Sequence, residues 1–314
     1  MSSRGVSYLS KRIKDFALSI GFDLIGIAAS KKLTDHKEVI DNWLSAGMNA
    51  DMQFISADID KRTDPGLLFN GAKSVVVAGI NYFPSQKQGD DGMPVISKYV
   101  YGKDYHIVLG EKLNLLLEFI TSCEPGAKGR ICVDSAPILE KAWAREAGLG
   151  WIGKNSILIN KEKGSFIFLG EIVLNLDLQY NKTFSEDFCG DCTLCLKACP
   201  TDAINENRTN DARKCISWIT VENKNPIPCE YAGRMKGRIF GCDICQDICP
   251  WNQNATPHKN PEFFLSEELK LLTSEEWFNL SREKFNSLFK NSSIKRRTYE
   301  RLMKNVTIVT NASS

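Results

Sequence analysis

The chain has 314 residues, 43% of them hydrophobic, so it can bury a sizeable core and is long enough for two or three domains. A formal net charge of +2 excludes a protein that is basic throughout, so any surface for nucleic acid must be local. The N-terminus lacks the apolar region of a secretory signal, and no apolar run approaches the roughly 20 residues of a membrane span. We therefore expect a cytoplasmic protein that does not contact a membrane.

Residues 1–178 alternate between helical and extended patterns, which is typical of an α/β domain. The run 73–83 is apolar at nearly every position, as in a strand that is buried on both faces. Neither the glycine-rich dinucleotide motif nor the P-loop motif is present in the sequence. Helices are expected at 8–21 and 104–122, and strands at 22–30, 73–83 and 165–178.

Residues 129–150 predict a strand, a sharp turn and a helix. Ser135 is a candidate N-cap of this helix, Pro137 suits its first turn, and Gly148 suits its exit. In this arrangement Asp134 comes just before the helix and could serve merely to cap it.

The second part of the chain, residues 179–256, is rich in cysteine. The sequence has 11 cysteines, and all but Cys123 and Cys132 lie between positions 189 and 249. Because the number is odd and secretion is not indicated, metal ligation is favoured over a disulfide framework. Only 3 histidines are present, which argues against a His-rich zinc or non-haem iron site.

The first cysteine run has the spacing C-x2-C-x2-C-x3-C-P and extends from Cys189 to Pro200. This is the spacing of bacterial ferredoxins, in which three thiolates bind one iron–sulfur cluster and the fourth binds a second cluster. A four-cysteine zinc ribbon needs only paired C-x2-C knuckles. The third cysteine and the terminal proline therefore favour a ferredoxin-like domain with two clusters.

The second run, "CDICQDICP", starts at Cys242 and matches the end of the first run, but Ile239 stands where its first cysteine would be. The second cluster is therefore one ligand short. Cys215 and Cys229 are the candidates. We favour Cys215, because residues 211–220 predict a short helix, which fixes a thiolate more firmly than the proline-rich loop around Cys229.

The complete ligand sets follow from the ferredoxin rule that the last cysteine of each run binds the cluster of the other run. The first cluster takes three cysteines of the first run and the last of the second. The predicted ligands are Cys189, Cys192, Cys195 and Cys249 for the first cluster, and Cys199, Cys215, Cys242 and Cys245 for the second.

The third part, residues 257–314, predicts a helical segment with a capping box from Thr273 to Glu276. Its stretch 281–305 is strongly basic, since Lys and Arg far outnumber Asp and Glu. A charge run is usually a solvated face, but this density of positive charge also suits a phosphate backbone. The candidate nucleic-acid contacts are Arg296, Arg297 and Arg301.

Four stretches of the sequence together resemble epoxyqueuosine reductase: "YGKDYHIVLGEKL", "VDSAPILEKAWAREAGLGWIGKN", the ferredoxin run, and "FGCDICQDICPWN". The resemblance implies an enzyme that reduces epoxyqueuosine in the tRNA anticodon loop to queuosine, with cobalamin and two [4Fe–4S] clusters as cofactors. It also implies an external electron donor and an α/β cobalamin-binding domain related to that of reductive dehalogenases. We expect the enzyme to be a monomer.

The resemblance further implies roles for single residues. Asp134 matches the proton donor, and we expect its pKa to be raised so that it is protonated near neutral pH. Tyr105 and His106 match a motif at the catalytic pocket, and Cys215 matches the extra ligand of the second cluster. The predicted cobalamin contacts are Arg62, Ser97, Asp134, Leu158, Leu169, Ser217, Cys242 and Asp243.

Two other functions fit part of the pattern. A reductive dehalogenase that acts on a small molecule would not need the basic stretch at 281–305. A ferredoxin-like electron carrier would use its α/β domain only to dock a partner and would bind no corrin. The visible spectrum of the protein supplied with cobalamin separates the carrier from the two enzymes.

Overall fold

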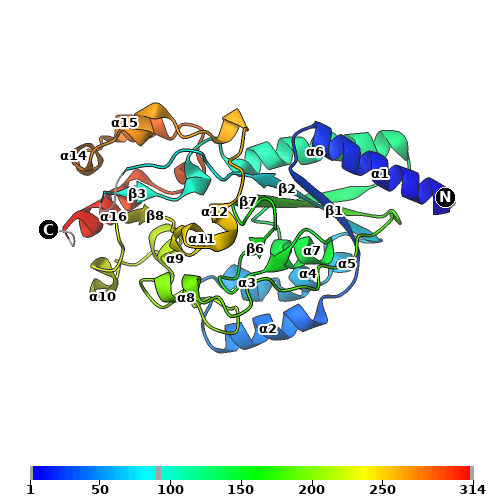
Figure 1. Cartoon of the computed structure of the whole chain (residues 1–314), viewed down its shortest axis with the longest axis horizontal. Coiled ribbons are helices and arrows are strands. Elements are labelled where there is room, and N and C mark those ends of the chain that lie inside the picture. Colours follow the sequence, from blue (N-terminus) through cyan, green and yellow to red (C-terminus); the bar gives the residue numbers. More distant parts are fainter. Residues whose placement is uncertain (1–2, 90–92, 312–314) are drawn as a thin grey trace.

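The computed structural model describes residues 3–89 and 93–311, and its centre is a four-stranded sheet (Figure 1). The strand order is β1, β2, β7, β4, and every neighbouring pair is antiparallel. The strands predicted at 22–30, 73–83 and 165–178 are confirmed. The four strands are β1 (Leu24–Ala29), β2 (Ser74–Asn81), β4 (Gly129–Cys132) and β7 (Ile167–Leu174).

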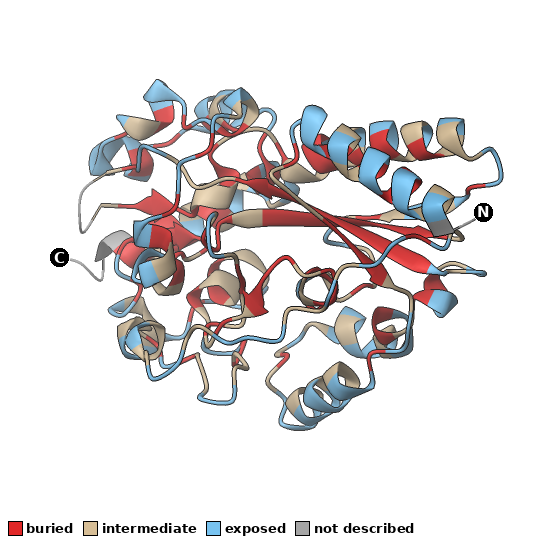
Figure 2. Ribbon diagram, turned by 45° about the vertical axis from the view of Figure 1, so that its right-hand side comes forward, coloured by how far each residue is buried: buried red, intermediate tan, exposed pale blue. Residues whose placement is uncertain are grey.

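Helices cover both faces of this sheet, so that its strands form a buried middle layer (Figure 2). One face is covered by α1 (Ser3–Ser19) and α6 (Tyr105–Cys123). The other face is covered by α7 (Glu140–Glu146), and four more helices lie on that side (Figure 1). These are α2 (Thr34–Ser45), α3 (Gln53–Ala57), α4 (Ile59–Thr63) and α5 (Pro65–Leu68).

Alternate residues of strand β2 point to opposite faces of the sheet and so contribute to the hydrophobic cores on both sides. Val76 and Ala78 belong to the core with α1 and α6, whereas Val75 and Val77 belong to the core with α7. Every residue of β2 is buried, as the sequence predicts. A run of this kind is most typical of parallel sheets, but this antiparallel sheet has it because both of its faces are covered.

The helix after β4 begins later than predicted. Residues 133–138 first form tight turns, in which Ala136 donates to the Val133 carbonyl and Ile138 donates to the Ala136 carbonyl. Helix α7 starts only at Glu140, so the prediction of Ser135 as its N-cap is wrong. The exit of α7 is as predicted, since the backbone turns at a glycine with a φ of +78° at position 148.

The two cysteine runs fold alike. Each carries one short helix, α8 (Leu194–Ala198) in the first run and α11 (Ile244–Asp247) in the second, and these helices pack against each other. The part 179–256 also contains α9 (Ile216–Val221), α10 (Cys229–Ala232), α12 (Pro250–Gln253) and strand β8 (Arg238–Phe240).

Short elements of the first part pack next to the cysteine-rich part. Strand β3 (Val95–Ile96) pairs in parallel with β8, and the 3-10 helix η1 (Lys98–Val100) follows it. Strands β5 (Trp151–Ile152) and β6 (Leu158–Ile159) form an antiparallel pair. The two parts are therefore joined by backbone pairing as well as by side chains.

The last part of the chain is a series of short helices rather than one basic helix. The capping box from Thr273 to Glu276 is confirmed at the start of α14. The basic stretch 281–305 covers several separate elements. The helices of this part are η2 (Pro261–Phe263), α13 (Glu267–Lys270), α14 (Ser274–Phe278), α15 (Arg282–Leu288), η3 (Ser293–Arg296) and α16 (Tyr299–Asn311).

One hydrophobic core joins all three predicted parts of the chain. Val100, Ile219 and Trp277, one from each part, are buried in the same cluster. The division into 1–178, 179–256 and 257–314 remains a proposal, and the shared core means that each part stabilises the others. Across the described residues, none of the helices combines the length and the apolar character that a membrane span needs.

Candidate functional site

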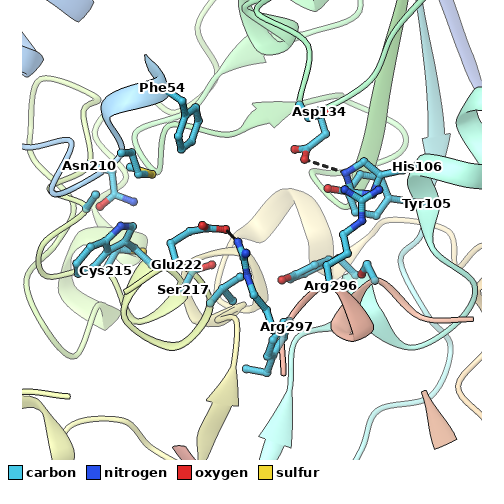
Figure 3. A pocket seen from close by; sticks show the side chains of 18 of the residues that line it. Phe54, Tyr105, His106, Asp134, Asn210, Cys215, Ser217, Glu222, Arg296 and Arg297 are labelled. Carbon is cyan, nitrogen blue, oxygen red and sulfur yellow. Dashed lines mark hydrogen bonds and ion pairs between the residues drawn. The ribbon is translucent and has the colours of Figure 1, made fainter. Parts of the chain in front are cut away.

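A cavity of about 1020 Å³ lies where the three parts of the chain meet (Figure 3). One wall comes from α3, α4 and the end of α2, including Phe54 and Arg62. Another wall comes from the start of α6 and the turn after β4, and includes Asp134. The remaining walls are α9 and its flanks, with Ser217, and the segment around η3, with Arg296. This volume is that of a pocket for a large ligand.

A smaller cavity of about 270 Å³ adjoins the first, because the two share Tyr99, Tyr105 and Asp134 as lining residues. Leu158 and Leu169 line the smaller cavity. The structure thus brings five of the predicted cobalamin contacts to one continuous site. They are Arg62, Asp134, Leu158, Leu169 and Ser217.

The other three predicted cobalamin contacts lie outside the walls of these two cavities. Ser97 and Asp243 are buried and bind each other, with Ser97 Oγ 2.5 Å from Asp243 Oδ1. Asp243 also accepts a hydrogen bond from the backbone N–H of Lys98 at 2.8 Å. Cys242 directly precedes Asp243. In the protein alone, Ser97 and Asp243 therefore join η1 to the start of α11.

Several buried polar atoms in the wall of the larger cavity lack a hydrogen-bond partner among the described residues. A buried polar atom is unfavourable unless it is paired, so these atoms indicate a ligand with polar groups of its own. Amide side chains around the rim of a corrin ring are groups of that kind. The atoms are Arg62 Nε, Asn210 Oδ1, Trp218 Nε1 and Ser293 Oγ.

A chain of hydrogen bonds leads from this pocket into the protein. His106 Nε2 lies 2.8 Å from Asp134 Oδ2 (Figure 3). On the other side of the ring, His106 Nδ1 lies 2.6 Å from Asp104 Oδ1. Asp104 caps α6 and also accepts from Arg296 Nε at 3.1 Å. The His106 side chain is therefore held between two carboxylates, of which only Asp134 is about half exposed in the pocket.

The charges along this chain differ from the prediction. Burial alone would raise the pKa of Asp134, but the hydrogen bond and the charge of His106 outweigh it, and the pKa is lowered. Burial alone would lower the pKa of His106, but its bonds to Asp134 and Asp104 outweigh that effect, and the pKa is raised. The expectation of a raised pKa for Asp134 is wrong for the protein alone, in which His106 holds the proton more firmly.

The backbone at Asp134 is also unusual. Its φ is +45°, in the left-handed region that residues with a side chain seldom adopt. The Asp134 N–H donates to Glu140 Oε1 at 2.7 Å. The interpretation of Asp134 as a helix cap is therefore wrong, because the Glu140 side chain, on the helix, accepts from the Asp134 backbone.

The cysteines of the first predicted cluster lie together. Burial raises the pKa of the Cys195 thiol, and the nearby thiols of Cys189, Cys249 and Cys192 raise it further. Burial likewise raises the pKa of Cys249, and Cys189 and Cys192 add to that rise. The last cysteine of the second run is thus brought to the first three of the first run.

The cysteines of the second predicted cluster also lie together. Burial raises the pKa of Cys242 to about 12, and the nearby Cys215 adds to that rise. Burial raises the pKa of Cys245, with further contributions from Cys242, Cys215 and Cys199. Cys215 stands directly before α9 and lines the large cavity, so this set of thiols adjoins the pocket. The side chain of Cys229 is not among those that the structure describes.

Among the described residues, no three Cys, His, Asp or Glu side chains converge closely enough to share a single metal ion. An iron–sulfur cubane does not need such convergence, because each thiolate binds a different iron.

The predicted nucleic-acid contacts do not form a free basic face. Arg296 and Arg297 line the cavity, and Arg297 forms an ion pair there with Glu222 (Figure 3). Arg296 is paired with Asp104. Arg301 donates to the backbone carbonyl of Asn223. The tertiary fold thus brings Arg296 and Arg297 into the wall of the pocket, whereas Arg301 does not line it.

Sequence reasoning missed several side chains of the site. Asp104 carried a usable signal, because an acid directly before a helical pattern is a candidate N-cap. Glu140 and Glu222 carried none, since their partners Asp134 and Arg297 become neighbours only through the fold.

Two cysteine sets beside a large pocket with unpaired polar walls are typical of an oxidoreductase with iron–sulfur clusters. A family model described as "4Fe-4S double cluster binding domain" matches residues 188–252, so the protein carries two [4Fe–4S] clusters. A second model, "Epoxyqueuosine reductase QueG, DUF1730", matches residues 62–135.

The protein's relatives agree with these matches. An epoxyqueuosine reductase of Leadbetterella byssophila is 47% identical, with 96% of this chain and 98% of that protein covered. The chain belongs to the epoxyqueuosine reductase family.

Solved structures of the family share this fold. A crystal structure of epoxyqueuosine reductase with an epoxyqueuosine-modified tRNA-Tyr stem loop matches with a TM-score of 0.89 at 30% identity, covering 98% of this chain and 82% of that chain. A Bacillus subtilis structure, described with its aspartate catalytic loop swung out of the active site, matches with a TM-score of 0.88 at 29% identity over the same shares. The predicted relation to reductive dehalogenases remains a prediction, because those structures match with TM-scores of only 0.45.

Proposed function

We propose that this protein reduces epoxyqueuosine in the anticodon loop of a tRNA to queuosine, with cobalamin in the large pocket. The observation that carries the proposal is the wall of this pocket, where Cys215, Asp134 and Arg296 face one cavity. In this proposal Cys215 is a cluster ligand, Asp134 transfers a proton, and Arg296 is a cation that can bind a phosphate. Membership of the family supports the choice of substrate.

Cobalamin fits the residues that line the two adjoining cavities. Leu158 and Leu169 offer an apolar wall, and Arg62 and Trp218 offer unpaired donors to amide groups on the ligand. Once bound and reduced, cobalamin would supply the electrons for the cleavage of the carbon–oxygen bonds of the epoxide. Cys242 belongs to the second cysteine set, and Ser97 hydrogen-bonds to the adjacent Asp243, so these three residues would support the cofactor from the side of that set.

The clusters bound by the two cysteine sets form the route by which electrons reach the pocket. Cys189, Cys192 and Cys195 are only partly buried, so an external electron donor can approach this side of the protein. Cys215 of the second set lines the pocket. We propose that the enzyme acts as a monomer in the cytoplasm, with a separate protein or small reductant as donor.

Asp134 and His106 move the proton. Reduction of an epoxide needs two electrons and protons, and the opening oxygen must be protonated as its bond breaks. In the resting enzyme His106 holds a proton between Asp104 and Asp134. We propose that Asp134 takes this proton from His106 and passes it to the substrate oxygen as the bond breaks. Tyr105 lines both cavities beside Asp134 and favours its charged form.

The proposed function is tested by single-turnover assay. Protein purified anaerobically with cobalamin, and then reduced, should show corrin absorption together with iron–sulfur absorption. It should convert an epoxyqueuosine-modified stem loop to queuosine, measured by nucleoside mass spectrometry. Missing corrin bands would favour the electron carrier, and removal of halide from a bromophenol without reduction of the stem loop would favour the dehalogenase.

We expect Arg296 and Arg297 to bind the tRNA backbone at the mouth of the pocket. Replacing both with alanine should weaken binding of the stem loop and lower the slope of log affinity against log salt by about 1 for each lost phosphate contact. Cobalamin and iron contents should not change. The measurement is a salt titration of stem-loop affinity.

The matched control is the pair Arg282→Ala and Lys284→Ala, which removes the same charge from the same stretch. Arg282 and Lys284 pair with Glu300 and Glu268 and do not line the large cavity. If this control lowers the salt slope as much as the pocket pair does, the stretch acts as a general positive field and our assignment is wrong.

A further inference from the structure

The turn that carries Asp134 is held in a strained shape. The left-handed backbone at Asp134, with a φ of +45°, is unfavourable for a residue with a side chain and persists only where the surroundings enforce it. Within the turn, the bond from the Ala136 N–H to the Val133 carbonyl is long, at 3.3 Å. The turn therefore needs support from outside itself.

Two contacts from neighbouring elements supply that support. Helix α6 provides His106 Nε2, 2.8 Å from the Asp134 carboxylate. Helix α7 provides Glu140 Oε1, which accepts from the Asp134 N–H at 2.7 Å. Only the second contact fixes the backbone. Since the Asp134 side chain is about half exposed, packing around the side chain itself holds it less than these two bonds do.

Glu140 lies among several ionisable side chains. Asp134, His106 and Lys141 act on it from the turn, from α6 and from its own helix, and Glu171 acts on it from β7. The charge of Glu140 also acts to raise the pKa values of Arg62 and Tyr105. Glu171 is fully buried, and neither of its carboxylate oxygens has a partner among the described residues. A carboxyl keeps an acceptor oxygen whether or not it is protonated, so the bond to Asp134 survives either state of Glu140.

We propose that Glu140 is a positioning residue, whose side chain anchors the Asp134 backbone so that the Asp134 carboxylate meets His106 in the pocket. Without this anchor the turn relaxes out of its left-handed shape and the carboxylate leaves His106. The inference rests on the proposed role of Asp134 for its effect on catalysis, but the contact with His106 can be measured without any reaction.

The titration of His106 reports the position of Asp134 directly. The chain has only 3 histidines, so NMR of protein with labelled imidazoles gives few signals, and a His106→Asn variant assigns the one of interest. The protein is used with both clusters present and oxidised, without cobalamin or tRNA. The pKa of His106 is raised by its bond to Asp134, so loss of that bond should lower it.

In Glu140→Leu we expect the pKa of His106 to fall by the same amount as in Asp134→Asn, and combining the two changes should give no further fall. Glu140→Gln keeps an acceptor oxygen, so this pKa should fall only by the effect of the lost charge of Glu140, and by less than in Glu140→Leu. If Glu140→Leu does not take up its full iron content, Glu140→Ala replaces it in the same comparison. A wild-type titration of His106 in the leucine or alanine variant would overturn the proposal.

The matched control is Glu146→Leu, at the other end of α7. Glu146 is buried and paired with Lys31 at 2.6 Å, and its charge acts on His36. This variant should move the titration of His36 and leave that of His106 unchanged. In turnover, Glu140→Leu should lose about 10²-fold in rate, the order of a small misplacement of a reacting group, with stem-loop affinity retained. An inactive wild-type enzyme would contradict the proposed function but would not alter the titration result.

Discussion

Replacing Asp134 with asparagine is expected to slow single-turnover reduction of the epoxyqueuosine stem loop by about 10²–10⁴-fold, the usual contribution of general acid catalysis. Asparagine keeps the shape of the side chain but cannot pass a proton from His106 to the substrate oxygen. Iron content and stem-loop binding should be unchanged, because Asp134 caps no helix and binds no cluster. Asp134 is also a predicted cobalamin contact that lines the pocket, so cobalamin occupancy is measured first and the rate is compared at equal occupancy. The measurement is the rate of queuosine formation by pre-reduced enzyme.

A matched control is available in the same turn. Ser135 also lines the pocket, so Ser135→Ala alters the neighbouring side chain without removing the acid. This variant should keep most of the rate. A near wild-type rate in Asp134→Asn would instead mean that another group protonates the oxygen, and Tyr105 would be the next candidate.

The same proton relay predicts how the rate depends on pH. His106 has a pKa above its ordinary value of 6.5, so its protonated form prevails below that raised pKa and is lost as pH rises through it. If His106 resupplies the proton, the wild-type rate should fall on the alkaline side, with a midpoint above 6.5. A rate that already falls through the ordinary range of a carboxyl would contradict the role of His106.

Replacing Cys215 with alanine is expected to remove the second cluster, and with it about half of the iron and the turnover that depends on the external donor. Cys215 lies with Cys242 and Cys245 and also lines the pocket, so it links the second cysteine set to the substrate side. Iron analysis and the electron paramagnetic resonance of the reduced protein measure this loss.

Two further alanine variants make this prediction specific. Cys229→Ala removes the other candidate ligand and should retain both clusters. Cys123→Ala removes a cysteine of α6, outside the cysteine-rich part, and should also retain both. Full iron in Cys215→Ala together with reduced iron in Cys229→Ala would reverse the ligand assignment.

The amino-acid sequence by itself was enough to predict two iron–sulfur clusters, which the family match confirms, and to propose a complete set of cysteine ligands for them. The spacing of Cys189 to Cys199 is a local pattern, and local patterns survive in the folded chain because a short helix and its flanks fix the distances between neighbours. The second run could be compared with the first for the same reason. The buried run in β2 and the helix over 104–122 were likewise readable from their periodicity.

Only the tertiary structure decided the direction of the strands and the partners at the pocket. Periodicity indicates which side of a strand is buried, but it does not indicate which strand lies beside it. The order of the strands and their antiparallel pairing could therefore not be predicted from the sequence. His106 contacts Asp134 across 28 positions of sequence, and Arg296 contacts Asp104 across 192.

Such long-range contacts reverse predictions that are made from single residues. His106 turns the expected rise in the pKa of Asp134 into a fall, and the fold brings two arginines of a seemingly solvated stretch into the wall of the pocket. A pKa and a binding wall depend on charges and surfaces within a few ångströms in space, and those neighbours are set by the packing of distant segments.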